Sequence, residues 1–230
     1  MRKLLIASVF INILLAGYII KVTVKPEKPV IVPIETVTNI QPDTVTYYLG
    51  RNEVFEKLPD TEDEIILVGN SLTHNFEWHE MFRDVNIINR GIGSDITRGV
   101  IQRLNEILKS KPRKLFLEIG INDIARDYPM DSIFSNYIKI IQITQIESPE
   151  TKIYLQSVLP CKEIWNSSIL EINRRIEKYS EQNGLTYIDL YTKFVKGAIL
   201  SPEFDCGDNV HLNGNGYQLW CRSINEYIYE

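Results

Sequence analysis

From about residue 51 onward, short apolar runs alternate with longer segments in which apolar residues recur every three or four positions. The short runs are rich in β-branched residues, which is typical of buried strands. They cover residues 65–69, 85–89, 114–120, 152–158 and 185–190. The longer segments, including 100–108 and 133–141, predict amphipathic helices. Because parallel neighbours need a crossover, strands alternating with helices of this length favour a parallel sheet covered on both faces.

The first 24 residues follow a different pattern. After Arg2 and Lys3, residues 4–20 carry no charge and form one apolar run. Such a run is typical of a signal peptide or of a membrane-spanning helix. No A-x-A cleavage pattern follows it, so an uncleaved anchor is favoured over a cleaved signal, and both stay open. Either segment predicts export, with the rest of the chain facing the periplasm or the cell exterior.

Prolines then mark the stretch between this segment and the alternating pattern. Pro26, Pro29, Pro33 and Pro42 stand among Val, Thr, Lys and Glu, a composition that favours an extended linker. We therefore expect an anchor or signal at 1–24, a linker at 25–50 and one α/β domain at 51–230.

The net charge and the number of cysteines narrow the range of functions expected for the chain. The chain has 230 residues, 25 Lys plus Arg and 30 Asp plus Glu, so its formal charge is −5. A nucleic-acid partner is not expected, because a basic binding surface is not evident. Three cysteines are too few for a disulfide scaffold or a zinc ribbon.

Polar residues follow several predicted strands, at the edge where the carboxyl ends of parallel strands meet. Ser71 comes two residues after the first run, where a helix start would leave its N–H unpaired. A serine there is more often a helix cap. The segment 89–95 (NRGIGSD) can form a tight loop after the second run. After the third run, Asn122 can donate to a negative oxygen or cap a turn.

Asp208 and His211 stand three positions apart near the C-terminus. On a turn, this spacing lets a carboxylate hold one imidazole nitrogen while the other faces a nucleophile. The remaining histidines, His74 and His79, lack an equally well-spaced acidic residue. The pair at 208 and 211 is therefore the candidate acid–base pair.

Together these segments resemble the SGNH hydrolases, also called GDSL-like esterases and lipases. The blocks occur in the family's order: GNSL at 69–72, NRGIGSD at 89–95, GIND at 120–123 and DNVH at 208–211. The resemblance covers roughly residues 62–230, and the ending HLNGNGYQLW looks like the carbohydrate acetylesterase and platelet-activating-factor-acetylhydrolase-like branch. It implies a three-layer α/β/α fold around a five-stranded parallel, flavodoxin-like sheet.

The resemblance also implies roles for five residues. Ser71 would be the nucleophile, His211 the general base and later the acid, and Asp208 the carboxylate that orients the imidazole. The oxyanion would accept hydrogen bonds from the backbone N–H groups of Ser71 and Ser94 and from the Asn122 amide. The reaction would need no metal or organic cofactor.

Two positions depart from the family's pattern. Asn70 stands where the family usually has Asp, so we expect altered local hydrogen bonding and retained activity. Ser94 stands where the family usually has Gly. If the loop needs a positive φ there, the serine would be strained and its N–H could be misplaced.

The implied reaction is hydrolysis of a short acyl ester, with O-acetyl groups on a carbohydrate favoured by the resemblance. Trp78, Tyr128 and Trp165 could stack on a sugar ring, although burial in the core is the commoner use of aromatic residues. A lysophospholipase, a thioesterase and an O-acyltransferase stay open, because they can use the same triad. Asn70 and Ser94 also motivate another class, a catalytically inactive, membrane-tethered glycan-binding module.

Cys161 and Cys206 both follow segments expected near the carboxyl ends of strands. If the domain is exported, a bridge between them could brace the loop of Asp208 and His211. The sequence alone does not decide whether this bridge forms. The expected partners are a small acyl ester or acetylated glycan and, through the N-terminal segment, a membrane.

Overall fold

A five-stranded parallel sheet lies at the centre of the computed structural model, which describes residues 42–83 and 85–230. The expected anchor or signal, and the expected linker up to residue 41, lie outside the described residues. The strand order is β2-β1-β3-β4-β5, the flavodoxin-like order, which confirms the predicted fold class. The strands are β1 (Ile65–Gly69), β2 (Ile87–Gly91), β3 (Lys114–Glu118), β4 (Lys152–Gln156) and β5 (Thr186–Ile188).

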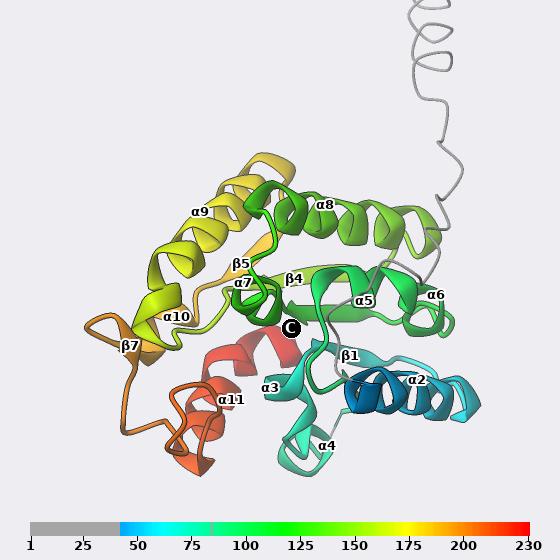
Figure 1. Ribbon diagram of the computed structural model, residues 1–230. Helices are drawn as coiled ribbons and strands as arrows, with labels where there is room; N and C mark the ends of the chain where they lie inside the picture. The colour runs from blue at the N-terminus through cyan, green and yellow to red at the C-terminus, as the bar shows by residue number, and fades with distance from the viewer. Residues whose placement is uncertain (1–41, 84) are drawn as a thin grey trace, which may run out of the picture. The chain divides into compact units, whose positions relative to one another are not determined.

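Helices cover both faces of this sheet and give three layers (Figure 1). One face packs against α5 (Thr97–Gln102), α6 (Leu104–Ile107), α8 (Met130–Glu147) and α9 (Asn166–Asn183). The other packs against α3 (Ser71–His74), α4 (Trp78–Met81), α10 (Tyr191–Phe194) and α11 (Gly214–Tyr229). The smaller elements are α7 (Ile121–Ala125), the 3-10 turn η2 (Glu163–Trp165), β6 (Val195–Lys196) and β7 (Ile199–Leu200). No helix within the described residues has the length and apolarity needed to cross a membrane.

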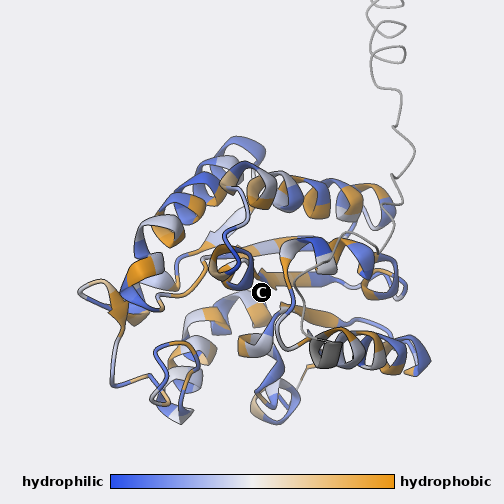
Figure 2. Cartoon of the chain, in the orientation of Figure 1, coloured by the Kyte–Doolittle hydropathy of each residue, from blue (hydrophilic) through white to orange (hydrophobic). Residues whose placement is uncertain are grey.

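Successive side chains of each strand point to opposite faces of the sheet, so the core is divided into two clusters. In β1, Ile66 and Val68 belong to the cluster beneath α5, α8 and α9, whereas Ile65 and Leu67 belong to the cluster beneath α4 and α11. Hydrophobic residues accordingly follow the central strands, whereas hydrophobic and hydrophilic residues alternate along α8 and α9 (Figure 2). Burial on both faces explains why the strands are almost continuously apolar.

The expected linker is wrong at its C-terminal end, because residues 42–50 belong to the helix α2 (Pro42–Lys57). Proline is compatible with a helix at its first position. Tertiary contacts then hold the helix against the sheet. The Tyr48 hydroxyl donates to the carbonyl of Gly99 at 2.8 Å, and Phe55, 2% exposed, lies 4.8 Å from the Arg90 guanidinium. The composition of the expected linker could not reveal these contacts, because the partner residues are distant in the sequence.

Candidate active site

Ser71 lies at the carboxyl edge of the sheet, as the first residue of α3. Asn70 caps this helix, because its side-chain oxygen accepts a hydrogen bond from the Leu72 N–H at 2.8 Å. The Ser71 N–H therefore has no acceptor within the helix. The Ser71 hydroxyl lies 3.0 Å from Nε2 of His211, which is 140 residues away in the chain.

Asn70 fulfils the capping role that an aspartate would fulfil at this position. Its Nδ2 atom, however, is buried and has no hydrogen-bond partner. The altered local hydrogen bonding expected at this position is therefore present as an unpaired donor. It leaves the contact between Ser71 and His211 in place.

His211 and Asp208 pair within one loop. The His211 Nδ1 atom lies 2.6 Å from Asp208 Oδ2, and the second carboxylate oxygen accepts the N–H groups of Val210 and His211 at 2.9 and 2.8 Å. Desolvation acts to raise the pKa of Asp208, but hydrogen bonds from the imidazole and from the two N–H groups outweigh it. The pKa of Asp208 therefore lies well below its ordinary value. The charged carboxylate orients the ring so that Nε2 faces Ser71.

The loop around this pair is held mainly by its own atoms. Asp205 Oδ1 accepts the N–H groups of Asp208 and Asn209 at 3.2 and 2.9 Å, and the Cys206 N–H donates to the His211 carbonyl at 2.9 Å. The side chains of His211 and Asp208 are 34% and 48% exposed. The imidazole is therefore accessible while the loop backbone is fixed.

The cysteines do not form the bridge considered for this loop. All three are free. The Cys161 thiol instead donates to the carbonyl of Asn209 at 3.0 Å, so it contacts the same loop without a covalent bond. Asp205, Cys206 and Asp208 bring possible metal ligands within 4.8 Å of one another, the one such cluster in the described part of the chain. Both carboxylates already accept backbone N–H groups, so this cluster serves the loop.

Asn122 and Ser94 lie on the loops that follow β3 and β2. Gly120 has φ 123°, a conformation that favours glycine, at the start of α7. The Asn122 side-chain nitrogen donates to the Asp95 carbonyl at 2.9 Å, which leaves its second hydrogen for another acceptor. Ser94 has φ 64°, the strained conformation anticipated if the loop needed a positive φ, and its carbonyl accepts from Arg126 at 3.1 Å.

A buried ion pair connects these loops to β1. Arg103 Nε donates to Asp95 Oδ2 at 3.0 Å, and a second guanidinium nitrogen donates to the Gly69 carbonyl at 3.3 Å. Asp95 directly follows Ser94, and its carbonyl holds Asn122. Gly69 ends the strand that precedes the serine. One guanidinium therefore links the segments that carry all three expected oxyanion donors.

Sequence reasoning missed the role of Arg103. Residues 100–108 were expected to form one helix, but α5 ends at Gln102 and α6 begins at Leu104. Arg103 lies on the apolar stripe of this segment, three residues after the buried Val100 and four before the buried Ile107. A charge on an apolar stripe was the available signal, because a buried guanidinium needs a partner.

Glu118, at the end of β3, is a second buried acid that was missed. It is fully buried, and neither carboxylate oxygen has a hydrogen-bond partner among the described residues. Burial raises the pKa of Glu118 to about 8, and the nearby N–H of Leu159 offsets only part of this effect. The side chain is therefore mostly neutral at pH 7.

The three aromatic residues considered for sugar stacking differ in exposure. Trp78 is fully buried, and its indole N–H donates to the Thr73 carbonyl, so it belongs to the core and is unavailable to a sugar. Trp165 is half-buried beneath the Lys162 ammonium, 5.3 Å from its ring centre. Tyr128 is exposed.

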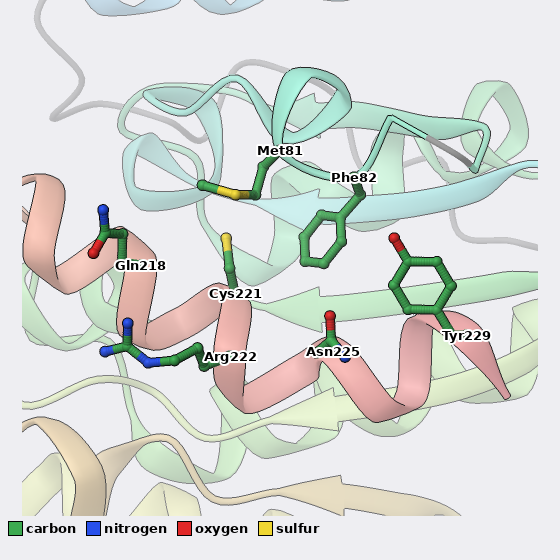
Figure 3. Close-up of a pocket in the computed structure, with 7 residues that line it drawn as sticks. All are labelled: Met81, Phe82, Gln218, Cys221, Arg222, Asn225 and Tyr229. Atoms are coloured by element: carbon green, nitrogen blue, oxygen red, sulfur yellow. The ribbon is translucent and has the colours of Figure 1, made fainter.

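A groove of about 430 Å³ lies apart from these residues, between α4 and α11 (Figure 3). It is lined by Met81, Phe82, Gln218, Cys221, Arg222, Asn225 and Tyr229. None of the five expected site residues lines this groove, so the candidate chemistry lies elsewhere.

Comparisons with known proteins identify the family and the fold. The GDSL-like Lipase/Acylhydrolase family model matches residues 67–219. The platelet-activating factor acetylhydrolase IB subunit alpha2 of Rattus norvegicus is 26% identical over 180 residues, covering 74% of this chain and 77% of the relative. The alpha1 subunit of Homo sapiens is 24% identical with the same coverage. A GDSL-like lipase structure from Bacteroides thetaiotaomicron has a TM-score of 0.71 and 25% identity, covering 79% of this chain and 97% of that chain.

Proposed function

Since the chain belongs to the GDSL-like lipase/acylhydrolase family of ester hydrolases, we propose that it removes short acyl groups, above all acetyl groups, by serine catalysis. One observation carries this proposal: an unbroken chain of polar contacts runs from the Ser71 hydroxyl through both nitrogens of His211 to Asp208, at 3.0 and 2.6 Å. A serine needs such a base, because its hydroxyl is a weak nucleophile while protonated.

In the first half of the proposed reaction, Ser71 Oγ attacks the ester carbonyl carbon and its proton passes to His211 Nε2. The carbonyl oxygen becomes an oxyanion that accepts hydrogen bonds from the N–H groups of Ser71 and Ser94 and from Asn122 Nδ2. When the C–O bond to the alcohol breaks, His211 returns the proton to the leaving alcohol. Ser71 then carries the acyl group as an ester.

In the second half, water attacks the acyl-enzyme and gives a proton to His211. The carboxylic acid leaves, and the proton returns to Ser71. Throughout both halves, Asp208 keeps the imidazole in one orientation and stabilises its charged form.

Two considerations support an acetyl ester on a carbohydrate. The relatives at 26% identity are named acetylhydrolases, which favours a small acyl group. The side chains of His211 and Asp208 are 34% and 48% exposed and Ser71 is partly exposed, so an ester projecting from a soluble polymer can reach the serine. The same relatives favour a second candidate, in which the acetyl group is carried by a phospholipid.

The test uses the purified full chain with three acetyl esters: an aryl acetate, an acetylated oligosaccharide and an acetylated phospholipid. Ser71→Ala should lower acetate release from every accepted ester by up to about 10⁶-fold, because the nucleophile is lost. Ser167→Ala, an exposed serine at the start of α9, is the matched control and should keep the parent rate. Equal rates for Ser71→Ala and parent, with equal circular dichroism spectra, would refute the proposed nucleophile.

The same assay separates the remaining alternatives. Adding an acceptor alcohol distinguishes an O-acyltransferase, which would form a new ester in place of free acetate. Longer acyl chains and thioesters test the lysophospholipase and thioesterase alternatives. Absence of turnover with all esters, together with binding of a glycan, would favour the inactive binding module.

We also propose that residues 1–24 export the chain, which is then either held at a membrane facing the periplasm or cell exterior or, if the segment is cleaved, secreted. The support is the uncharged run at 4–20, which follows two basic residues. Mass measurement of the protein recovered from a membrane fraction tests this proposal. An intact mass supports the anchor, a mass without the segment supports a cleaved signal, and recovery from the cytoplasm contradicts both.

A further inference from the structure

The helix α2 lies outside the segment that the family model matches, residues 67–219, yet it contacts a residue close to the candidate site. Its residue Tyr47 places its hydroxyl 3.2 Å from Nε2 of His74. The two rings meet edge to face, with 6.2 Å between their centres. Tyr47 is 46% exposed, so much of its ring is open to solvent.

Two residues that lie close to Tyr47 in space, His74 and Gly93, belong to segments that flank the proposed reaction centre. His74 lies in α3, three residues after Ser71, and neighbours at that spacing occupy one side of a helix. Gly93 directly precedes Ser94, and a Cβ atom at Gly93 would lie 3.4 Å from Tyr47 Cε1. Tyr47 therefore spans the distance between the helix of the nucleophile and the loop of an expected oxyanion donor.

Two other side chains of α2 hold this helix in place. Tyr48 donates to the carbonyl of Gly99 in α5, the helix that follows this loop, at 2.8 Å. Phe55 is buried beside the guanidinium groups of Arg51 and Arg90, at 4.7 and 4.8 Å from its ring centre. Because the helix is anchored on both sides, Tyr47 is positioned before any ligand arrives, which lowers the entropy cost of binding.

On the premise of the proposed esterase function, we propose that Tyr47 and His74 form a subsite for the alcohol part of the ester, and that this part is a sugar ring. An exposed aromatic ring can pack against the apolar face of a sugar. His74 Nδ1 donates to the Gly91 carbonyl at 3.0 Å, so Nε2 accepts from the Tyr47 hydroxyl and holds it in place. The Tyr47 oxygen can still accept a hydrogen bond from a sugar hydroxyl. An alkyl chain offers no such donor.

The test compares two esters with the same acyl group and different alcohols, glucose pentaacetate and ethyl acetate. Both are assayed by acetate release from the full chain. Tyr47→Ala should lower kcat/KM for the sugar ester about 3- to 10-fold, mainly through KM, because one aromatic contact is lost. Ethyl acetate has no sugar ring to pack against Tyr47, so its kcat/KM should stay within about twofold of the parent value. Tyr47→Phe keeps the ring and should lose less than Tyr47→Ala.

Val54→Ala is the matched control. Val54 is also 46% exposed and lies seven residues, or roughly 10 Å, further along the same side of α2. It should leave both esters unaffected.

Two outcomes would overturn the subsite: a ratio of kcat/KM between the sugar ester and ethyl acetate that Tyr47→Ala leaves unchanged, or a parent enzyme without preference for the sugar ester. Loss of activity on an acetylated phospholipid alone would assign Tyr47 to a lipid and also contradict the proposal. The Ser71→Ala variant distinguishes failure of the subsite from failure of the proposed function. Activity that survives this substitution refutes the proposed function, whichever result the Tyr47 variants give.

Discussion

The two sides of the candidate active site are held in place by different kinds of contact. The loop of Asp208 and His211 is exposed, and its hydrogen bonds join residues within a few positions of one another. The opposite side depends on a fully buried ion pair between Arg103 and Asp95, and on the bond from Asn122 to the Asp95 carbonyl. These bonds join segments that are distant in the sequence.

An exposed and a buried acid show the same contrast. Asp208 is exposed and well bonded, and its pKa lies below the ordinary value. Glu118 is buried without a partner, and desolvation raises its pKa to about 8. We infer that substitutions on the exposed side change rate with little effect on stability, whereas those on the buried side change both.

Among substitutions that compare the two sides, Asp208→Asn should have the largest effect on rate. It keeps the side-chain shape but removes the charge that orients His211, and the analogous change in a serine triad lowers kcat about 10⁴-fold. The melting temperature should stay close to the parent value, because the side chain is exposed and an amide oxygen still accepts the loop N–H groups. Kinetics and thermal unfolding of the same sample check both parts. A large fall in melting temperature together with the loss of rate would show that the exposed side also determines stability.

Arg103→Met tests the buried side and should lower the free energy of unfolding by about 3–5 kcal/mol, because Asp95 is left as an unpaired buried charge. Denaturant titration measures this change. The kcat should also fall at a temperature where the variant is still folded, since the oxyanion donors lose their common support. Arg175→Met is the control. Its partners Asp131 and Glu171 are exposed and solvent screens both ion pairs, so it should lower the free energy of unfolding far less than Arg103→Met does.

Asn122→Ala removes one proposed oxyanion donor and should lower kcat about 10²- to 10³-fold with little change in KM. The donor acts on charge that develops in the transition state, which is why ground-state binding is spared. Steady-state kinetics with the aryl acetate measure both constants. A rise in KM at constant kcat would instead assign Asn122 to substrate binding.

Glu118→Gln should change how stability depends on pH. Between about pH 4.5 and 8 the folded state holds a proton on Glu118 that the unfolded chain has released, so the free energy of unfolding falls as pH rises. Glutamine mimics the protonated form. The variant should therefore gain about 3 kcal/mol over the parent between pH 5 and pH 7.5, as followed by denaturant titration. If the free energy of unfolding changed with pH in the same way in the variant and in the parent, Glu118 would ionise normally.

The same contrast explains what could be predicted from the sequence. The strands were predictable because burial on both faces makes them continuous apolar runs, and Asp208 and His211 were predictable because their spacing brings them together on a turn. Local pattern could not show that Arg103 reaches Asp95 and Gly69, or that Tyr47 reaches His74, because those contacts arise only when the sheet brings distant segments together. The helix α2 was missed for the same reason: Tyr48 and Phe55 are ordered by distant partners.

Ser94→Gly should have the smallest effect and the opposite sign. Ser94 has φ 64°, where a side chain costs free energy and glycine does not. Relief of this strain should raise stability by about 1 kcal/mol, or roughly 2–4 °C in melting temperature for a domain of this size. The kcat should stay within about twofold, because the substitution keeps the backbone N–H that is proposed to bind the oxyanion. Asp127→Gly, at φ 55° on an exposed turn, is the control and should gain stability without any change in rate. A tenfold fall in kcat for Ser94→Gly alone would show that the serine side chain, and not only its N–H, acts on the substrate.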